Sequence, residues 1–306
     1  DSRGVDAGLR PEVLEPHRSS SIGVSVPRRS SAPPRTVASG ATVVGMALSS
    51  RTTSRAPRPT IEFTVLETTW LNPHLVRVRL GGPGFVQFQD RPETDKYVKL
   101  KFTTPEPESH PVTRTYTVRH VDRAAQAIDV DFVIHGDEGL AGPWAATVEP
   151  GATISLMGPG GGYSPDPDAD WHLFAGDMSA VPAIAAALEA LPVHAVGAAI
   201  IEVDTEADIL DLDHPSGVDV VWISNPDHAV SALADAVRTI DWREGRVHVF
   251  AHGEREAMKE LRRVFFDEHA LERGQVSLSG YWARGRTEDR FQAEKREPIG
   301  QILPPA

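Results

Sequence analysis

Apolar and polar residues alternate along the chain from Ile61 to about residue 157, and this period of two predicts half-buried strands. The predicted strands cover residues 61–66, 74–80, 97–102, 114–119, 128–134 and 153–157. Turn signals separate several of them, at Asn72-Pro73, Gly81-Gly82-Pro83-Gly84 and Pro105-Glu106-Pro107, and residues 158–163 are expected to form a loop. Short antiparallel strands spaced in this way favour a small barrel.

A different pattern begins at Trp171, where strands alternate with helical segments. Residues 194–203 form an apolar run that is typical of a strand buried in a parallel sheet. Predicted strands cover residues 171–175, 194–203, 218–223, 247–251 and 276–281, and predicted helices cover 180–191, 227–240 and 255–269. The sequence therefore predicts an N-terminal antiparallel β-barrel in residues 59–166 and a C-terminal open parallel α/β domain in residues 167–306.

Residues 1–58 form a tail rich in Ser, Pro and Arg, with nine Arg against four acidic residues. The tail is expected to be disordered, because it has no strand or helix period and cannot offset its ordering entropy by apolar burial. Two interpretations stay open. Arg28-Arg29 with the mildly apolar run 43–48 resembles a twin-arginine export signal, whereas a tail without function would place the natural start at Met46.

Composition limits the chemistry. The chain has 306 residues, enough for about two domains, and no Cys, which excludes disulfides, thiolate-held clusters or zinc, and a Cys nucleophile. Any redox chemistry must therefore come from a bound organic cofactor. The net charge of −12 disfavours nucleic-acid binding, and no apolar run reaches the roughly 18 residues that membrane insertion needs.

The order of a barrel followed by an α/β sheet suggests a flavin and nicotinamide reductase, in which the barrel holds the flavin. The predicted strand Arg114-Thr115-Tyr116-Thr117-Val118-Arg119 supports this interpretation. Arg offers a planar fork for a diphosphate, Tyr a flat surface for a ring, and Thr a hydroxyl for a flavin nitrogen. Alternation places Arg114, Tyr116 and Val118 on one face of the strand and Thr115, Thr117 and Arg119 on the other.

Six further stretches follow this strand in order. They are Asp131-Phe132-Val133-Ile134-His135-Gly136, Gly139-Leu140-Ala141-Gly142-Pro143-Trp144-Ala145, Gly158-Pro159-Gly160-Gly161, Gly176-Asp177-Met178-Ser179-Ala180-Val181-Pro182-Ala183-Ile184, His252-Gly253-Glu254 and Tyr281-Trp282-Ala283-Arg284-Gly285-Arg286-Thr287-Glu288. With these motifs the sequence resembles the siderophore-interacting proteins, FAD-dependent ferric-siderophore reductases that use NADH or NADPH and share the ferredoxin-reductase plan.

In the barrel half, the resemblance implies that FAD is bound by a defined set of residues. Arg114 would hold the FAD phosphate, Tyr116 would lie along the flavin or ribityl chain, and Thr117 would face the isoalloxazine edge. The remaining implied FAD contacts are His135, Gly136, Gly139, Leu140, Ala141, Gly142 and Trp144, around a helix that begins near Pro143. The family's Gly-Pro-Ala-Ser is replaced here by Gly139-Leu140-Ala141-Gly142, so the Ser hydroxyl on phosphate is missing.

In the second half, the resemblance implies an NADH or NADPH site at the ends of the parallel strands. Its residues would be Gly176, Asp177, Ser179, Ala180, Gly253, Glu254, Tyr281 and Trp282. No Gly-x-Gly-x-x-Gly occurs at the Gly176 turn, which disfavours a Rossmann dehydrogenase. A ferric siderophore, mostly an anionic oxygen chelate, needs a local basic pocket, for which the candidates are Lys99, Lys101, Arg284 and Arg286.

The expected function is reduction of a ferric siderophore to Fe(II) by a monomeric, cytoplasmic FAD enzyme that uses NADH or NADPH and contributes no catalytic acid or base. Two alternatives stay open: a general flavin reductase, and a siderophore- or flavin-binding protein without turnover. The sequence predicts no metal site in the protein and no Ser/His/Asp triad, and the acidic residues between 202 and 213 are expected to form an exposed loop.

Overall fold

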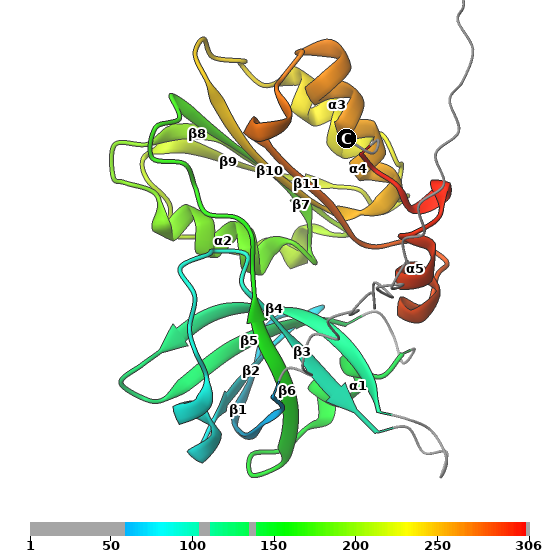
Figure 1. Cartoon of the computed structure of the whole chain (residues 1–306). Coiled ribbons are helices and arrows are strands. Elements are labelled where there is room, and N and C mark those ends of the chain that lie inside the picture. Colours follow the sequence, from blue (N-terminus) through cyan, green and yellow to red (C-terminus); the bar gives the residue numbers. More distant parts are fainter. Residues whose placement is uncertain (1–58, 104–110, 135–138, 304–306) are drawn as a thin grey trace, which may run out of the picture. The chain divides into compact units, whose positions relative to one another are not determined.

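Six antiparallel strands close a barrel in the order β1-β2-β5-β4-β3-β6 (Figure 1). The computed structural model describes residues 59–103, 111–134 and 139–303, which belong to one compact unit. The barrel strands are β1 (Ile61–Asn72), β2 (Leu75–Gly81), β3 (Tyr97–Phe102), β4 (Val112–Asp122), β5 (Ala127–Val133) and β6 (Thr153–Gly160). The predicted antiparallel barrel is thus confirmed, whereas the expectations for the tail fall outside the described residues.

Alternation along the strands builds the barrel core. Ile61, Phe63 and Val65 of β1 are each at most 3% exposed, while the residues between them face outward. The short helix α1 (Ala141–Thr147) begins two residues before the predicted start at Pro143 and packs Ala141 and Ala145 into this core. A 3₁₀ turn, η1 (Pro83–Gln87), occupies the predicted Gly-Pro turn between β2 and β3.

The last barrel strand is longer than predicted. Residues 158–160 were expected to begin a loop, but β6 continues through Gly160, which pairs with Tyr97 of β3. A Cβ atom at Gly160 would lie 2.5 Å from the Tyr97 ring, so this position requires glycine for close approach rather than for a turn. The Gly and Pro residues were therefore wrongly interpreted as the end of the strand.

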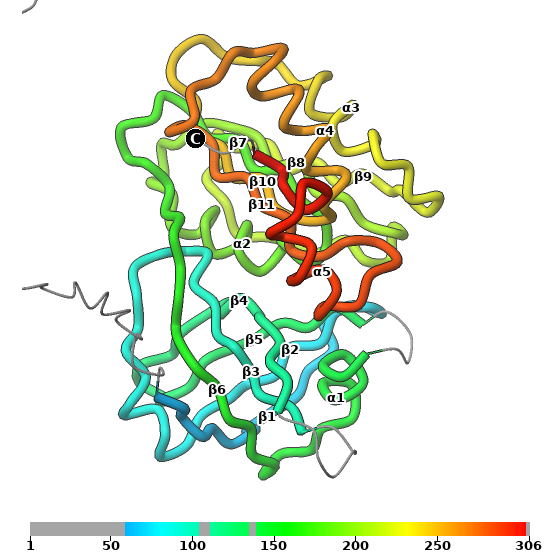
Figure 2. Tube along the Cα trace, turned by 45° about the vertical axis from the view of Figure 1, so that its right-hand side comes forward, coloured from blue at the N-terminus to red at the C-terminus, as the bar shows by residue number. Residues whose placement is uncertain are grey.

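The second half contains a five-stranded parallel sheet of order β11-β10-β7-β8-β9. Its strands are β7 (Trp171–Asp177), β8 (Val196–Val203), β9 (Gly217–Ser224), β10 (Val247–Glu254) and β11 (Val276–Trp282). Helix α2 (Val181–Ala190) covers one face, while α3 (Ala232–Thr239) and α4 (Arg255–Arg262) cover the other (Figures 1 and 2). The predicted open α/β domain is confirmed, and all carboxyl ends of its strands lie at one edge.

Helix limits differ from the sequence prediction at three places. Residues 227–231 form turns instead of the start of α3, because the Asn225 side chain bonds the N–H and carbonyl of Ala229. After α4 the chain continues as a π-helical segment, Arg263–Glu268. Helix α5 (Glu288–Glu294), capped by Thr287, was not predicted, since its seven residues show too little apolar periodicity.

Contacts between the barrel and the sheet half fix the space between them. Arg119 of β4 pairs with Glu189 of α2, and the side chain of Leu75 of β2 is buried in the core around α2. His74 Nδ1 lies 2.6 Å from Oδ1 of Asp208, whose side chain is only 1% exposed. The expectation of an exposed loop over residues 202–213 is therefore wrong at Asp208, which the barrel covers.

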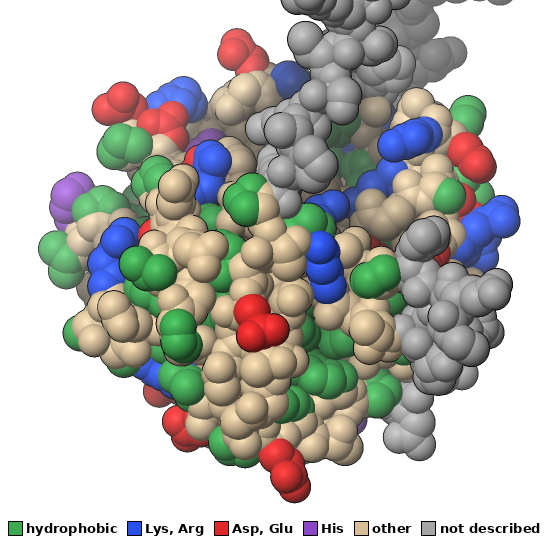
Figure 3. All heavy atoms as spheres, turned by 60° about the horizontal axis from the view of Figure 1, so that its bottom comes forward, with side chains coloured by type: hydrophobic (Ala, Val, Ile, Leu, Met, Phe, Trp, Pro, Cys, Tyr) green, Lys and Arg blue, Asp and Glu red, His purple; other side chains and the backbone are tan. Residues whose placement is uncertain are grey.

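Figure 3 views the molecule from the barrel end. Lys and Arg side chains of the described residues lie scattered on this face among acidic and apolar ones, rather than gathered in one area.

Candidate functional site

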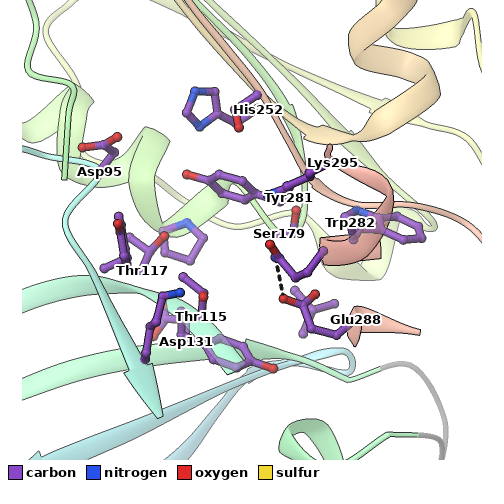
Figure 4. Close-up of a pocket in the computed structure, with 17 residues that line it drawn as sticks. Asp95, Thr115, Thr117, Asp131, Ser179, His252, Tyr281, Trp282, Glu288 and Lys295 are labelled. Atoms are coloured by element: carbon purple, nitrogen blue, oxygen red, sulfur yellow. Dashed lines mark hydrogen bonds between the residues drawn. The ribbon is translucent and has the colours of Figure 1, made fainter. Parts of the chain in front are cut away.

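A cavity of about 460 Å³ lies between the barrel and the sheet half (Figure 4). The barrel contributes Tyr116 and Thr117 from β4, and the sheet half contributes Tyr281 and Trp282 from the end of β11. In Figure 4 the Tyr281 hydroxyl points toward the side of the cavity where Thr117 lies. Two motifs that are about 165 residues apart in the sequence, numbered 116–117 and 281–282, thus line one space.

Strand β4 uses its two faces as predicted. Val118 is buried in the barrel core and Tyr116 packs on Phe132, with ring centroids 4.3 Å apart, while Thr115 and Thr117 face the cavity. The Tyr116 ring also reaches the cavity, and burial raises the pKa of its phenol, so the hydroxyl stays protonated at neutral pH. The strand therefore presents hydroxyl groups and one supported aromatic ring.

Asp177 organises the edge of the sheet. Its Oδ1 accepts hydrogen bonds from Ser179 N (2.9 Å) and Oγ (2.5 Å), and its Oδ2 accepts from Glu254 N (2.7 Å) and Trp282 Nε1 (2.8 Å). The carboxyl group thereby joins the turns after β7, β10 and β11. Burial raises its pKa, against which these four donors act. Asp177 therefore fixes the positions of Ser179, Glu254 and Trp282 at this edge of the sheet.

A second cavity, of about 890 Å³, lies at the carboxyl edge of the sheet. It shares Val133, Ser179, Trp282 and Glu288 with the first cavity, so the two are contiguous. The predicted residues that line it are Arg114, Gly139, Asp177, Ser179, Glu254, Trp282, Arg284 and Arg286. The edge of a parallel sheet where strand order reverses is the usual ligand site of such domains.

Comparisons with known proteins agree with this geometry. Residues 169–285 match the sequence model described as Siderophore-interacting protein, and residues 101–163 match the Siderophore-interacting FAD-binding domain. The ferric vibriobactin reductase ViuB of Vibrio cholerae is 37% identical over 195 residues, which cover 62% of this chain and 71% of ViuB. The chain belongs to the siderophore-interacting protein family.

Two further members are similar over most of their length. An uncharacterised protein of Mycobacterium tuberculosis is 47% identical over 275 residues, covering 79% of this chain and 96% of that protein. The crystal structure of a siderophore utilization protein from T. fusca superimposes with a TM-score of 0.69 at 32% identity, covering 76% of this chain and 95% of the other. The resemblance inferred from the motifs is confirmed.

The family's FAD-binding domain matches residues that run from the end of β3 through β6. The cavities fit such a cofactor in two respects. Tyr116 and the Thr115 and Thr117 side chains offer a ring surface and hydroxyls, and a Cβ atom at Gly139, whose φ is +87°, would meet nothing within 4 Å. The backbone near Gly139 is thus open to a ligand, as a loop that approaches a diphosphate must be.

Several predicted FAD residues do not turn their side chains toward either cavity. Leu140, Ala141 and Trp144 pack on the barrel core, where Trp144 contacts Phe102 and Phe132, and Gly142 is likewise absent from both linings. His135 and Gly136 lie outside the described residues. The structure therefore gives these α1 side chains a packing role in the barrel.

Three residues that were predicted to contact NADH or NADPH instead pack behind the carboxyl edge of the sheet. A Cβ atom on Gly176 would lie 2.6 Å from the His252 carbonyl, and one on Gly253 would lie 2.7 Å from the Asp177 carboxylate. Ala180 is buried in the core around α2. These small residues allow close packing of the turns and line neither cavity.

The candidate basic residues separate in the structure. Lys99 lines the first cavity, and Arg284 and Arg286 line the second, whereas Lys101 lies outside both and donates a hydrogen bond to Thr60 Oγ1 at 2.6 Å. Of the two candidates on β3, Lys99 thus reaches a cavity and Lys101, two residues further along the strand, does not.

Several residues that line the first cavity were not among the predicted site residues, and His252 and Lys295 are two of them. His252, at the end of β10, is 5% exposed, its Nε2 lies 3.0 Å from Ser277 Oγ, and its buried Nδ1 has no hydrogen-bond partner. Burial lowers its pKa to about 3. The motif His252-Gly253-Glu254 could have indicated that His252 lies at the site, since its neighbours were predicted there. Lys295 follows the unpredicted helix α5, so the sequence gave no indication of it.

The described residues contain no group of three or more His, Asp or Glu side chains placed to hold a metal ion. Over the same part of the chain, no helix is long and apolar enough to cross a membrane.

Proposed function

We propose that the chain binds FAD against β4 and uses NADH or NADPH to reduce a ferric siderophore to the Fe(II) form, releasing the iron. The observation that carries the proposal is the shared cavity, which brings Tyr116 and Thr117 of the matched FAD-binding domain to Tyr281 and Trp282 at the sheet edge. Hydride transfer requires the nicotinamide and flavin rings to lie in contact, and a cavity lined by both halves can hold them together.

FAD, when bound, accepts two electrons together as a hydride and passes single electrons to Fe(III). One NAD(P)H therefore yields two Fe(II). The chain's residues align the partners: Tyr116 offers a ring surface backed by Phe132, Thr117 offers a hydroxyl, and the Asp177 network holds Ser179, Glu254 and Trp282 in place. No side chain is assigned proton transfer.

We assign siderophore binding to the basic side chains that reach the cavities, Lys99, Lys295, Arg284 and Arg286. Partial burial lowers the pKa of Lys295, the charge of Glu288 raises it and the charge of Lys99 lowers it, so Lys99 and Lys295 repel each other across the cavity. An anionic chelate between them relieves this repulsion. Ferrous iron matches hard anionic oxygens less well than Fe(III), so reduction favours release.

The test is an anaerobic absorbance experiment with the purified protein, added FAD, NADH or NADPH, a ferric siderophore and a ferrous chelator. We expect flavin bands that bleach with the nucleotide and return as two Fe(II) are trapped per NAD(P)H consumed. Bleaching without trapped Fe(II) would instead indicate a general flavin reductase, and a colourless protein that binds the chelate would indicate binding without turnover.

Matched lysine variants test the substrate assignment. Lys99→Gln should raise the KM for the ferric siderophore about tenfold, because it removes one charged hydrogen-bonding group from the cavity. Lys101→Gln removes the same charge two residues away, outside both cavities, and should leave KM unchanged. Equal effects of the two substitutions would contradict the assignment.

We further propose that the enzyme works as a monomer in the cytoplasm, where NADH and NADPH are available. A molecular mass measured by light scattering, and activity recovered after cell fractionation, test the two parts of this statement.

A further inference from the structure

Glu202 occupies a defined place at the sheet edge. It is the register partner of Asp177 on the neighbouring strand, near the end of β8, and its Oε1 accepts a hydrogen bond of 3.0 Å from Asn225 Nδ2. Asn225 is 6% exposed, and the rest of its amide is engaged with Ala229. The amide is therefore fixed, and it holds the Glu202 carboxylate at the wall of the second cavity.

Negative charge gathers at this part of the cavity. Asp204, two residues further along on the same face of the chain, and Asp177 line it together with Glu202. Burial raises the pKa of Glu202 to about 7, and the charges of Asp177 and Asp204 add to this shift, while Asn225 and Arg284 oppose it. His228 Nδ1 lies 3.4 Å from Asp204 Oδ1. A further anion here would meet strong repulsion.

The arginines of the second cavity are mostly engaged elsewhere. Arg114 pairs with Asp289, and Arg255 and Arg286 both pair with Glu294. Arg284 is held over the Trp282 ring at 5.2 Å, just after β11. Its charge nonetheless reaches Glu202, whose pKa it lowers. Of the arginines that line the cavity, Arg284 is therefore the candidate partner for a 2′-phosphate, against the carboxylates of Glu202 and Asp204.

We propose that Glu202 makes the enzyme select NADH over NADPH, by accepting a hydrogen bond from the 2′-hydroxyl of the adenosine ribose. This inference rests on the proposed function, since it concerns the nucleotide of that reaction. In open α/β sheets an acidic residue at the end of the strand after the phosphate turn binds the ribose hydroxyl, whereas an Arg accommodates the 2′-phosphate. Glu202 ends the strand that follows the Gly176-Asp177 turn.

Charge explains the discrimination. The 2′-phosphate of NADPH is a phosphate monoester of about −1.5 to −2 charge at neutral pH, and it would lie beside Glu202 and Asp204. The ribose hydroxyl of NADH instead donates a charge-assisted hydrogen bond to the ionised form of the same carboxyl group, so the discrimination should strengthen as the pH rises above about 7. Discrimination therefore comes from one attractive and one repulsive contact at a single residue.

The experiment measures binding and reduction separately. NAD⁺ and NADP⁺ are titrated into the FAD-loaded protein by calorimetry, and flavin bleaching by NADH and NADPH is followed anaerobically. We expect NAD⁺ to bind at least about tenfold more tightly than NADP⁺. Glu202→Gln should reduce this ratio about tenfold, and Asp204→Asn should reduce it less.

Glu206→Gln is the matched control, because Glu206 is an exposed acid of the same segment that does not line the cavity. It should leave the ratio unchanged. A wild-type preference for NADP⁺, or equal effects of Glu202→Gln and Glu206→Gln, overturns the inference. A preference for NADP⁺ that Arg284→Ala abolishes would assign the 2′-phosphate to Arg284. If neither nucleotide binds or bleaches the flavin, the proposed function itself fails, which is a distinct result.

Discussion

Arg114 donates two hydrogen bonds to Asp289, from Nη1 to Oδ1 at 3.0 Å and from Nη2 to Oδ2 at 3.3 Å. The two residues are 175 positions apart and join β4 of the barrel to α5. The guanidinium fork that we assign to the FAD phosphate therefore faces a carboxylate in this structure. Because the Asp289 side chain is 70% exposed, the pair is easily exchanged for a stronger anion.

We expect Asp289→Ala to tighten FAD binding about two- to fivefold, since it removes the anion that competes for Arg114. Arg114→Ala should weaken FAD binding at least about tenfold, because charged hydrogen bonds to the phosphate are lost. Flavin fluorescence during titration of the apoprotein measures both. Asp235→Ala, which removes one of the two acidic partners of Arg238 in helix α3, is the control. Weaker FAD binding by Asp289→Ala would contradict the exchange.

The support of Tyr116 by Phe132 gives a second expectation. Phe132 is fully buried, so Phe132→Ala should lower the free energy of unfolding by about 3–5 kcal/mol. It should also weaken FAD binding, because Tyr116 loses the ring on which it packs.

Phe63→Ala removes an equally buried barrel ring that does not contact Tyr116 and should cost similar stability with less effect on FAD. Urea unfolding and FAD titration separate the two effects, with Phe132→Leu as the milder variant. Equal losses of FAD affinity would remove the special role of Phe132.

Acid should destabilise the protein from about pH 6.5 downward. Burial lowers the pKa of His252 from 6.5 to about 3 and that of His172 to about 4. Below pH 6.5 the unfolded chain therefore binds protons that the folded chain does not, and stability falls until the folded pKa is passed. For His252 alone the slope is roughly 1 kcal/mol per pH unit.

Urea midpoints between pH 7.5 and 5 measure this slope. His252→Gln should flatten it, leaving the share of His172, whereas His194→Gln at an exposed position should not. A wild-type stability that stays constant over this range would show that His252 protonates freely in the folded state.

Glu294 ties α5 to the sheet half. Its side chain is 1% exposed and accepts hydrogen bonds from Arg255 (2.6 Å), Arg286 (2.9 Å) and Arg290 (2.8 Å). These arginines lower the pKa of Glu294 from 4.5 to about 2, so its contribution to stability is full above pH 4.5 and is lost as the pH falls toward 2.

We expect Glu294→Gln to lower the melting temperature by about 5 °C or more and to speed proteolysis near α5, because buried Arg255 loses its buried partner and keeps only the more exposed Glu256. Glu297→Gln, at an exposed position in the next turn, should change neither. Differential scanning calorimetry and limited digestion provide the measurements. An unchanged digestion rate would mean that the apolar contacts of Phe291 hold α5 alone.

The local pattern was sufficient for most elements of the fold. The alternation at Ile61, Phe63 and Val65 predicts β1 because each strand residue faces one side of a two-sided layer. The sequence pattern gave the wrong end for β6, because pairing with Tyr97 of β3 keeps Gly160 in the strand despite its preference for turns. It also failed at α5, whose seven residues depend on Glu294 and Phe291 reaching into the rest of the molecule.

By itself the sequence determined the order of barrel and sheet, the family, and the motif Arg114-x-Tyr116-Thr117, because these depend on residue type and period along the chain. Tertiary structure alone decided which of these residues meet. It joined Thr117 to Tyr281 in one cavity, turned Trp144 into the barrel core and Lys101 away from the site, and buried Asp208 under His74. Such contacts depend on how two separately predicted halves pack, and no local period encodes that.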